Sequence, residues 1–231
     1  MLRSLRSMLA FRIRATDGCL GSVHDFHFDA DSRRIRYLVA SLGIRSLWRK
    51  VLVPADRLIR PDAPNREIRV SLTRDELWHS ANITSDPPIH RQIQYEAWNY
   101  YSWICHGTPM GAQSEPKPSF DPQPGANGQS LRYLLGYEVY TTEGKAGLLS
   151  DLLVNEETHC IRAIAVRSCD GKCVLVLVDS IRSINCLERA VYLDINRAGL
   201  IGAPEFDPLA ADNAVLEDRI LAHDAHPSSR Q

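Results

Sequence analysis

Two stretches of this sequence match each other: residues 9–21 read LAFRIRATDGCLG, and residues 135–147 read LGYEVYTTEGKAG. At this offset of 126 positions the turn glycines coincide, Gly18 with Gly144 and Gly21 with Gly147. The match continues without a gap past residue 38, and it resumes at an offset of 123 after a three-residue deletion. An internal match of this length predicts two copies of one module, over roughly residues 5–80 and 131–206.

Each copy has the sequence pattern of short strands. Residues 11–15 and 67–72 alternate apolar with polar side chains, and residues 35–40 are rich in β-branched and aromatic types. Residue types that are typical of turns separate these runs. We expect four glycines to be structural turn residues: Gly18, Gly21, Gly144 and Gly147. Several short strands in fewer than 80 residues favour a mainly β chain made of two tandem small antiparallel β-barrels.

The copies divide the chain into domains at residues 1–80 and 131–206, with a connector at 81–130 between them. Apolar and aromatic residues recur at helical spacing within the connector, which predicts a helix over about residues 90–104. Residues 107–128 are rich in proline and glycine and are expected to form an extended linker. Residues 207–231 form an acidic tail.

Composition indicates a soluble globular protein, with 44% hydrophobic and 24% charged residues. The longest aliphatic run, residues 174–178, is far too short for a membrane span, and no secretory signal is evident, so we expect a cytoplasmic location. Charge is unevenly distributed: residues 1–80 hold 15 basic and 9 acidic side chains, and residues 81–231 hold 12 and 19. A basic first half is typical of a solvated face or of a surface that meets an acidic partner.

These residues resemble the PRC-barrel family, named after the cytoplasmic domain of the photosynthetic reaction-centre H subunit. The resemblance is carried by residues 15–26, ATDGCLGSVHDF, by residues 36–39, RYLV, and by residues 48–53, WRKVLV. Residues 87–92, PPIHRQ, followed by residues 100–103, YYSW, are similar to the bacterial two-repeat branch. The resemblance implies the barrel fold, but it says little about function because one fold hosts many roles.

No short catalytic motif occurs in the sequence, neither a phosphate-binding glycine loop nor a nucleophile elbow nor a zinc-binding helix. His24 and His27 are expected on opposite faces of one strand, where they cannot share a metal ion. Asp25 and Asp151 occupy equivalent positions and are better structural than catalytic candidates. We therefore expect no enzyme activity, no catalytic residues, no bound metal and no cofactor.

Two groups of residues are candidates for binding. A basic group in the first copy could meet an anionic partner, and it comprises Arg33, Arg34, Arg45, Arg49 and Lys50. An aromatic group is expected at an interface and comprises Trp48, Trp98, Tyr100, Tyr101 and Trp103. We interpret the chain as a homodimeric adaptor that binds a protein partner; the alternatives are an RNA- or ribosome-associated module and a soluble accessory of a membrane electron-transfer complex.

Overall fold

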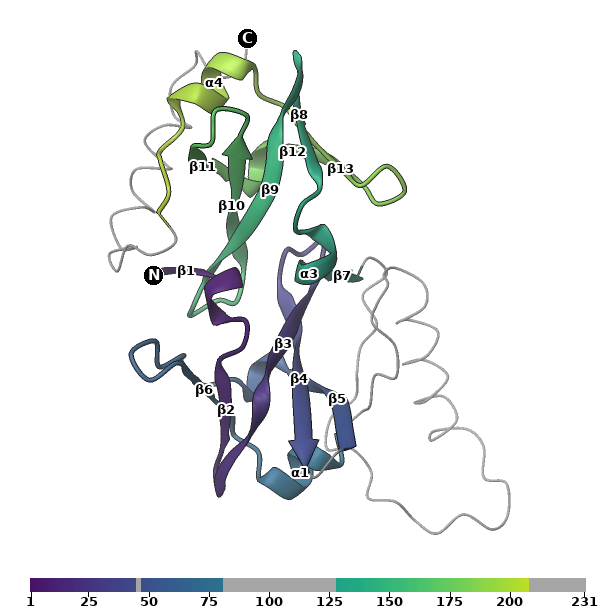
Figure 1. The fold of residues 1–231 in the computed structure, drawn as a ribbon, viewed down its shortest axis with the longest axis vertical. Coiled ribbons are helices and arrows are strands. Elements are labelled where there is room, and N and C mark those ends of the chain that lie inside the picture. Colours follow the sequence, from purple (N-terminus) through teal and green to yellow (C-terminus); the bar gives the residue numbers. More distant parts are fainter. Residues whose placement is uncertain (45–46, 81–127, 208–231) are drawn as a thin grey trace, which may run out of the picture. The chain divides into compact units, whose positions relative to one another are not determined.

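The computed structural model describes residues 1–44, 47–80 and 128–207, and these residues are mainly β (Figure 1). The chain forms two compact units. The N-unit consists of Met8–Tyr133, and the C-unit combines Met1–Ser7 with Leu134–Gln231. The unit boundaries therefore assign the first seven residues to the unit that holds the second sequence copy.

The N-unit is built on a six-stranded sheet with the strand order β5-β4-β3-β2-β6, and β7 pairs with β3 outside this path. Among the described residues of this unit, the strand pairs are antiparallel except β2 with β6, which run parallel. The strands are β2 (Arg12–Ala15), β3 (Gly18–Asp29), β4 (Ile35–Ile44), β5 (Leu47–Pro54), β6 (Glu67–Arg69) and β7 (Gly128–Ser130). The described part of this unit also contains the short helices η2 (Ala55–Arg57) and α1 (Arg74–Trp78), the second of which begins with a capping box at Thr73 and Glu76.

The C-unit has a seven-stranded sheet with the order β11-β10-β9-β8-β13-β12, and β1 pairs with β9 outside this path. Here β8 and β13 are the parallel pair. The strands are β1 (Leu2–Ser4), β8 (Glu138–Thr141), β9 (Gly144–Asn155), β10 (Ile161–Ser168), β11 (Cys173–Leu177), β12 (Ile181–Asn185) and β13 (Ala190–Leu193). The helices are η3 (Val178–Ser180) and α4 (Arg197–Gly202), while η1 (Arg6–Met8) and α3 (Leu131–Leu134) span the two points where the chain passes from one unit to the other.

The mainly β prediction is confirmed, but the prediction of purely antiparallel barrels is not. Both sheets are mixed, and within the described residues neither strand order closes on itself. The alternating pattern is borne out in β2, where Ile13 and Ala15 are buried and Arg12 and Arg14 are exposed. Alternation does not encode the direction in which a neighbouring strand runs, so the parallel pairs were missed.

The predicted connector is described only at its end. Residues 81–127, which include the predicted helix at 90–104 and almost all of the proline-rich linker, lie outside the described residues. Gly128–Ser130, which the sequence assigns to the connector, form strand β7. The tail beyond residue 207 also lies outside the described part of the chain.

The four turn glycines are of two kinds. Gly18 and Gly144 each begin a strand with a positive φ. A Cβ atom on Gly147 would overlap the backbone carbonyl of Arg167, and one on Gly21 would overlap the carbonyl of Ser41. Glycine is therefore required at these two positions because a neighbouring backbone occupies the space of a side chain.

Candidate functional site

Two short segments, here called the arms, dock onto the long strands of the two units. Arm 1 is residues 1–7 and contains β1, which pairs antiparallel with β9. Arm 2 is residues 128–133 and contains β7, which pairs antiparallel with β3. Each arm includes the sequence Ser-Leu-Arg, at residues 4–6 and 130–132, and each docks beside a buried aspartate.

In the C-unit, Asp151 holds arm 1 through both of its carboxylate oxygens. The Ser4 hydroxyl donates to Oδ2, and the backbone N–H of Arg6 donates to Oδ1 at 2.9 Å. The Arg6 guanidinium donates to the carbonyl of Ser150 at 3.0 Å, and the N–H of Ser7 donates to the Ser4 hydroxyl oxygen at 2.9 Å. Because Asp151 is 2% exposed, these donors supply the hydrogen bonds that water cannot.

The N-unit repeats this arrangement with Asp25 and arm 2. The Ser130 hydroxyl donates to Asp25 Oδ2 at 2.5 Å, and the N–H of Arg132 donates to Oδ1 at 3.1 Å. The Arg132 guanidinium donates to the carbonyl of His24 at 3.4 Å, and the N–H of Tyr133 donates to the Ser130 hydroxyl oxygen at 3.2 Å. Each of these four hydrogen bonds has a counterpart in the C-unit, and each residue lies 126 positions from its counterpart.

The two aspartates differ in their ionisation. Burial raises the pKa of Asp151 above its ordinary value, in spite of the hydrogen bonds from Ser4 and Arg6. At Asp25 burial acts in the same direction, but the interactions with His27 and the hydrogen bonds from Ser130 and Arg132 together outweigh it and lower the pKa. His27 Nε2 lies 3.6 Å from Asp25 Oδ2. The C-unit has Leu153 at the equivalent position, so Asp151 lacks the interaction with a histidine that helps to lower the pKa of Asp25.

Ser130, Asp25 and His27 do not form a nucleophilic triad. In such a triad a histidine accepts the serine proton, whereas here the Ser130 hydroxyl donates to the carboxylate directly. His24 lies with its Nδ1 3.0 Å from the Arg132 guanidinium, whereas His27 lies beside Asp25. In the described ranges no three His, Cys, Asp or Glu side chains are placed to hold a metal ion.

The structure does not bring the predicted basic group together. Arg33 and Arg34 lie in the turn before β4, whereas Lys50 on β5 pairs with Ser41 near the other end of β4. Seven residues of extended strand separate these positions, which is about 23 Å. Arg45 lies outside the described residues.

The remaining member of that group, Arg49, is engaged within its own unit. Its guanidinium donates to the carbonyl of Ser80 at 3.2 Å and lies 5.8 Å from the centre of the Trp78 ring. Among the predicted aromatic interface residues, Trp48 belongs to β5. The others, Trp98, Tyr100, Tyr101 and Trp103, lie outside the described residues.

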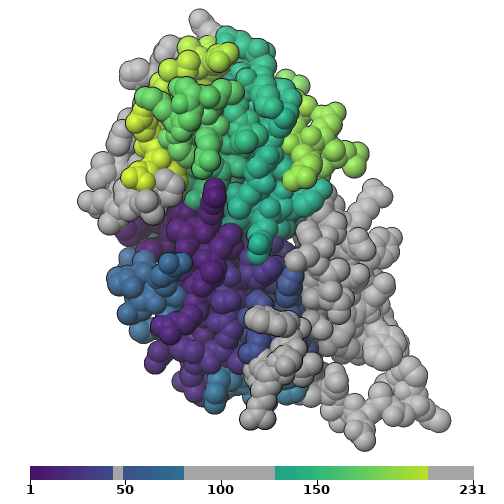
Figure 2. Space-filling view, viewed as in Figure 1, coloured from purple at the N-terminus to yellow at the C-terminus, as the bar shows by residue number. Residues whose placement is uncertain are grey.

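A different basic surface emerges from the parallel pair β2 and β6. Arg12, Arg14 and Arg69 project from it with side chains 65%, 52% and 56% exposed, and Arg14 lies directly opposite Arg69. Glu67 lies between them, 2.9 Å from Arg12 and 3.5 Å from Arg14, with its side chain only 7% exposed. We call this surface the arginine face. Figure 2 shows the purple and blue segments of the N-unit, the colours of β2 and β6.

The sequence contains the signal for the arginine face, because arginines two positions apart in a strand point to the same side. It was missed because the parallel pairing of residues 12–14 with residues 67–69 could not be foreseen. Like charges directly opposite each other are destabilising in a sheet. Packing of the unit therefore does not require Arg14 opposite Arg69.

The equivalent surface of the C-unit, on β8 and β13, has another chemistry. Tyr140 and Tyr192 stack with their ring centres 5.4 Å apart. Their hydroxyls donate at 2.7 Å to Glu138 and Glu188 respectively, and the hydrogen bond to Glu138 raises the pKa of Tyr140. We call this surface the tyrosine-glutamate face. The same strand pair thus presents arginines in one unit and aromatic and acidic side chains in the other.

No helix among the described residues has both the length and the apolar character needed to span a membrane. Neither a protein-family model nor a curated protein matches the chain.

Proposed function

We propose that this protein is a non-enzymatic binding protein whose N-unit recognises an acidic surface of a protein partner through the arginine face. The observation that carries the proposal is the contrast between two equivalent strand pairs. Residues 12, 14 and 69 are arginines in the N-unit, and the corresponding residues 138, 140 and 192 are glutamate and two tyrosines. A shared scaffold with different outward chemistry is expected when two units bind different surfaces.

The electrostatics of the arginine face favour a carboxylate ligand. Guanidinium groups present rigid forked donors that match carboxylates, and a partner carboxylate between Arg14 and Arg69 would relieve their mutual repulsion. Glu67 already pairs with Arg12 at 2.9 Å and with Arg14 at 3.5 Å. The positive charge that is not paired with Glu67 therefore lies at Arg69. Asp62 lies 3.7 Å from Arg69 and accepts two hydrogen bonds from Asn65, so a partner carboxylate would share Arg69 with Asp62.

The proposal also includes the architecture that the sequence suggests: a tandem PRC-barrel-like protein that acts as a cytoplasmic homodimer. The hydrogen bonds shared by Asp25 and Asp151, at positions 126 apart, support the tandem repeat. We prefer a protein ligand to a nucleic acid because the arginine face is small and has no interleaved aromatic ring on which a base would stack.

The proposal is tested by affinity capture from a lysate of the protein's own source, with and without nuclease. The Arg14→Ser/Arg69→Ser variant removes two exposed charges and keeps the 2.9 Å pair between Arg12 and Glu67. Arg162→Ser/Arg182→Ser, at two exposed positions of the C-unit, is the matched control.

We expect a specific protein to be captured by the wild type and the control, to survive nuclease, and to be lost from the arginine-face variant. Equal capture by all three chains would contradict the proposal. Loss of all captured proteins on nuclease treatment would favour the nucleic-acid alternative instead.

A further inference from the structure

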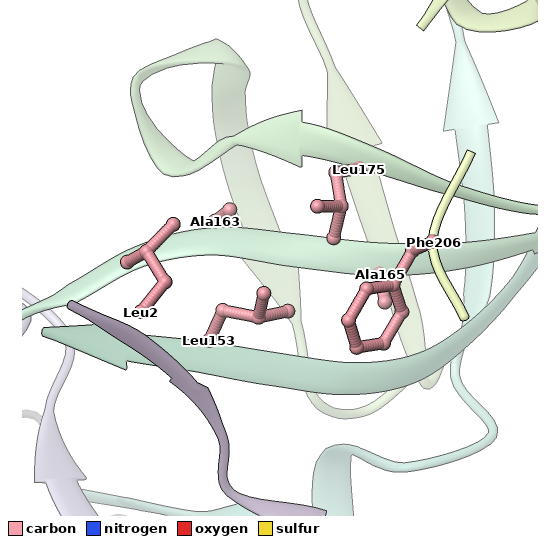
Figure 3. Close-up of a cluster of buried hydrophobic side chains, with 6 residues drawn as sticks. All are labelled: Leu2, Leu153, Ala163, Ala165, Leu175 and Phe206. Atoms are coloured by element: carbon pink, nitrogen blue, oxygen red, sulfur yellow. The ribbon is translucent and has the colours of Figure 1, made fainter. Parts of the chain in front are cut away.

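The site on the C-unit that receives arm 1 is a strand-binding surface with its own selectivity. Leu2 is 1% exposed and packs in an apolar cluster with Leu153 and Leu175, two alanines of β10 and Phe206 (Figure 3). Three residues farther along the arm, Leu5 is fully buried. Backbone pairing with β9, two buried leucines and the bonds to Asp151 together recognise the sequence Leu-x-Ser-Leu-Arg.

The residues around the shared Ser-Leu-Arg sequence determine which arm fits which unit. In arm 1, Leu2 packs in the apolar cluster, and Arg3 forms an ion pair with Glu156. Arm 2 has Gly128 and Gln129 at these positions. The N-unit in turn has His27 where the apolar cluster has Leu153. A glycine in place of Leu2 would remove a buried side chain from the apolar cluster, so this site favours arm 1 over arm 2.

The connectivity of the chain shows how arm 1 is attached to this site. Arm 1 continues at Met8 into the N-unit, so no covalent bond links it directly to the main segment of the C-unit, which begins at Leu134. All contacts between arm 1 and the C-unit are therefore noncovalent. An identical arm from a second chain can make the same contacts, and the choice between the two depends on effective concentration.

We propose that the arm-1 site of the C-unit also binds arm 1 of a second copy of this chain, so that two copies exchange arms. This inference rests on the proposed homodimer and names the segment that joins its subunits; it does not depend on the arginine face. The occupant is fixed by the recognition sequence, because Leu-x-Ser-Leu-Arg occurs at residues 2–6, whereas arm 2 has glycine in place of the first leucine.

The test uses disulfide trapping in the full-length chain. Arg3 and Val154 are direct cross-strand partners of β1 and β9, so the Arg3→Cys/Val154→Cys variant places two thiols within bonding distance. Heavy-isotope and ordinary chains of this variant are mixed, equilibrated and oxidised, and the linked peptides are identified by mass spectrometry. The matched control is Ser183→Cys/Tyr192→Cys in the β12–β13 hairpin, where both cysteines belong to one continuous segment.

We expect disulfides between the two introduced cysteines to join heavy with ordinary chains of the variant, in a proportion that rises with protein concentration. The control should give same-chain linkages alone. Same-chain linkage alone in the variant, up to about millimolar protein, would overturn the proposal. Light scattering on the same samples measures the oligomeric state and so separates the homodimer proposal from the arm-exchange proposal. A dimer without mixed linkage would retain the homodimer and overturn arm exchange.

A second measurement avoids substitutions in the protein. A fluorescent peptide of residues 1–8 is added to the wild-type chain, and a peptide of residues 128–135 serves as the control. We expect the first peptide to bind at least several-fold more tightly and to be displaced by its unlabelled form. Equal binding of both peptides, or binding of neither, would contradict selective recognition of arm 1.

Discussion

Replacement of Ser4 by alanine removes the bond that most directly fastens arm 1 to the C-unit. Ser4 is 3% exposed, its hydroxyl donates to Asp151, and its oxygen accepts from the N–H of Ser7. Loss of a donor to a buried carboxylate costs about 2 kcal/mol. That loss corresponds to a roughly 30-fold rise in the local opening equilibrium.

Hydrogen exchange read by mass spectrometry measures this opening separately in each unit. In Ser4→Ala we expect faster exchange along β9 and no change along β3. The loss should shrink as the pH falls, because the pKa of Asp151 is raised and its neutral form needs the donor less. Ser130→Ala should affect β3 less strongly, because His27 still lies 3.6 Å from Asp25. Unchanged exchange along β9 in Ser4→Ala, or an equal loss of protection along β3, would show that the bond between Ser4 and Asp151 does not fasten arm 1 to β9.

Three further predictions concern ionisation, packing and the arginine face. The pKa of Asp151 is raised, so the contribution of Asp151 to the stability of the C-unit should fall as the pH rises above 3.8, and the difference between wild type and Asp151→Asn isolates this contribution. The pKa of Asp25 is lowered, so the N-unit should instead lose stability as the pH falls below 3.8; melting curves of wild type and each Asn variant across this range test both signs. Gly147→Ala should lower the melting temperature markedly, because the new Cβ would overlap a carbonyl of β10; an unchanged temperature would contradict this. Arg14→Ser/Arg69→Ser should change the free energy of unfolding by less than about 1 kcal/mol, since both charges are exposed, and a larger loss in denaturant titrations would indicate a structural role.

Much of the fold could be predicted from local sequence patterns. The alternation of residues 11–15 appears in β2 as exposed arginines on either side of buried Ile13. The glycines that recur at an offset of 126 begin β3 and β9, two strands of equal length. These features are local, because side-chain direction in a strand and turn geometry depend on neighbours in the sequence.

The pairing of distant strands could not be predicted in the same way. The Ser-Leu-Arg sequences of the two arms lie 126 positions apart, so the repeat of the motif was visible. The sequence did not indicate which aspartate each arm would meet, because Asp25 and Asp151 offer the same acceptors to either serine. The arginine face was hidden for a related reason, since it depends on the parallel pairing of β2 with β6.

The measurement that tests the docking of each arm on the other copy of the module most directly is a set of backbone nuclear Overhauser contacts in the full-length chain. We predict contacts between Ser4 and Leu153, and between Ser130 and His27, because these residues are cross-strand partners. Contacts of Ser4 with His27 and of Ser130 with Leu153 would mean that each arm docks on its own copy of the module, and they would contradict this docking.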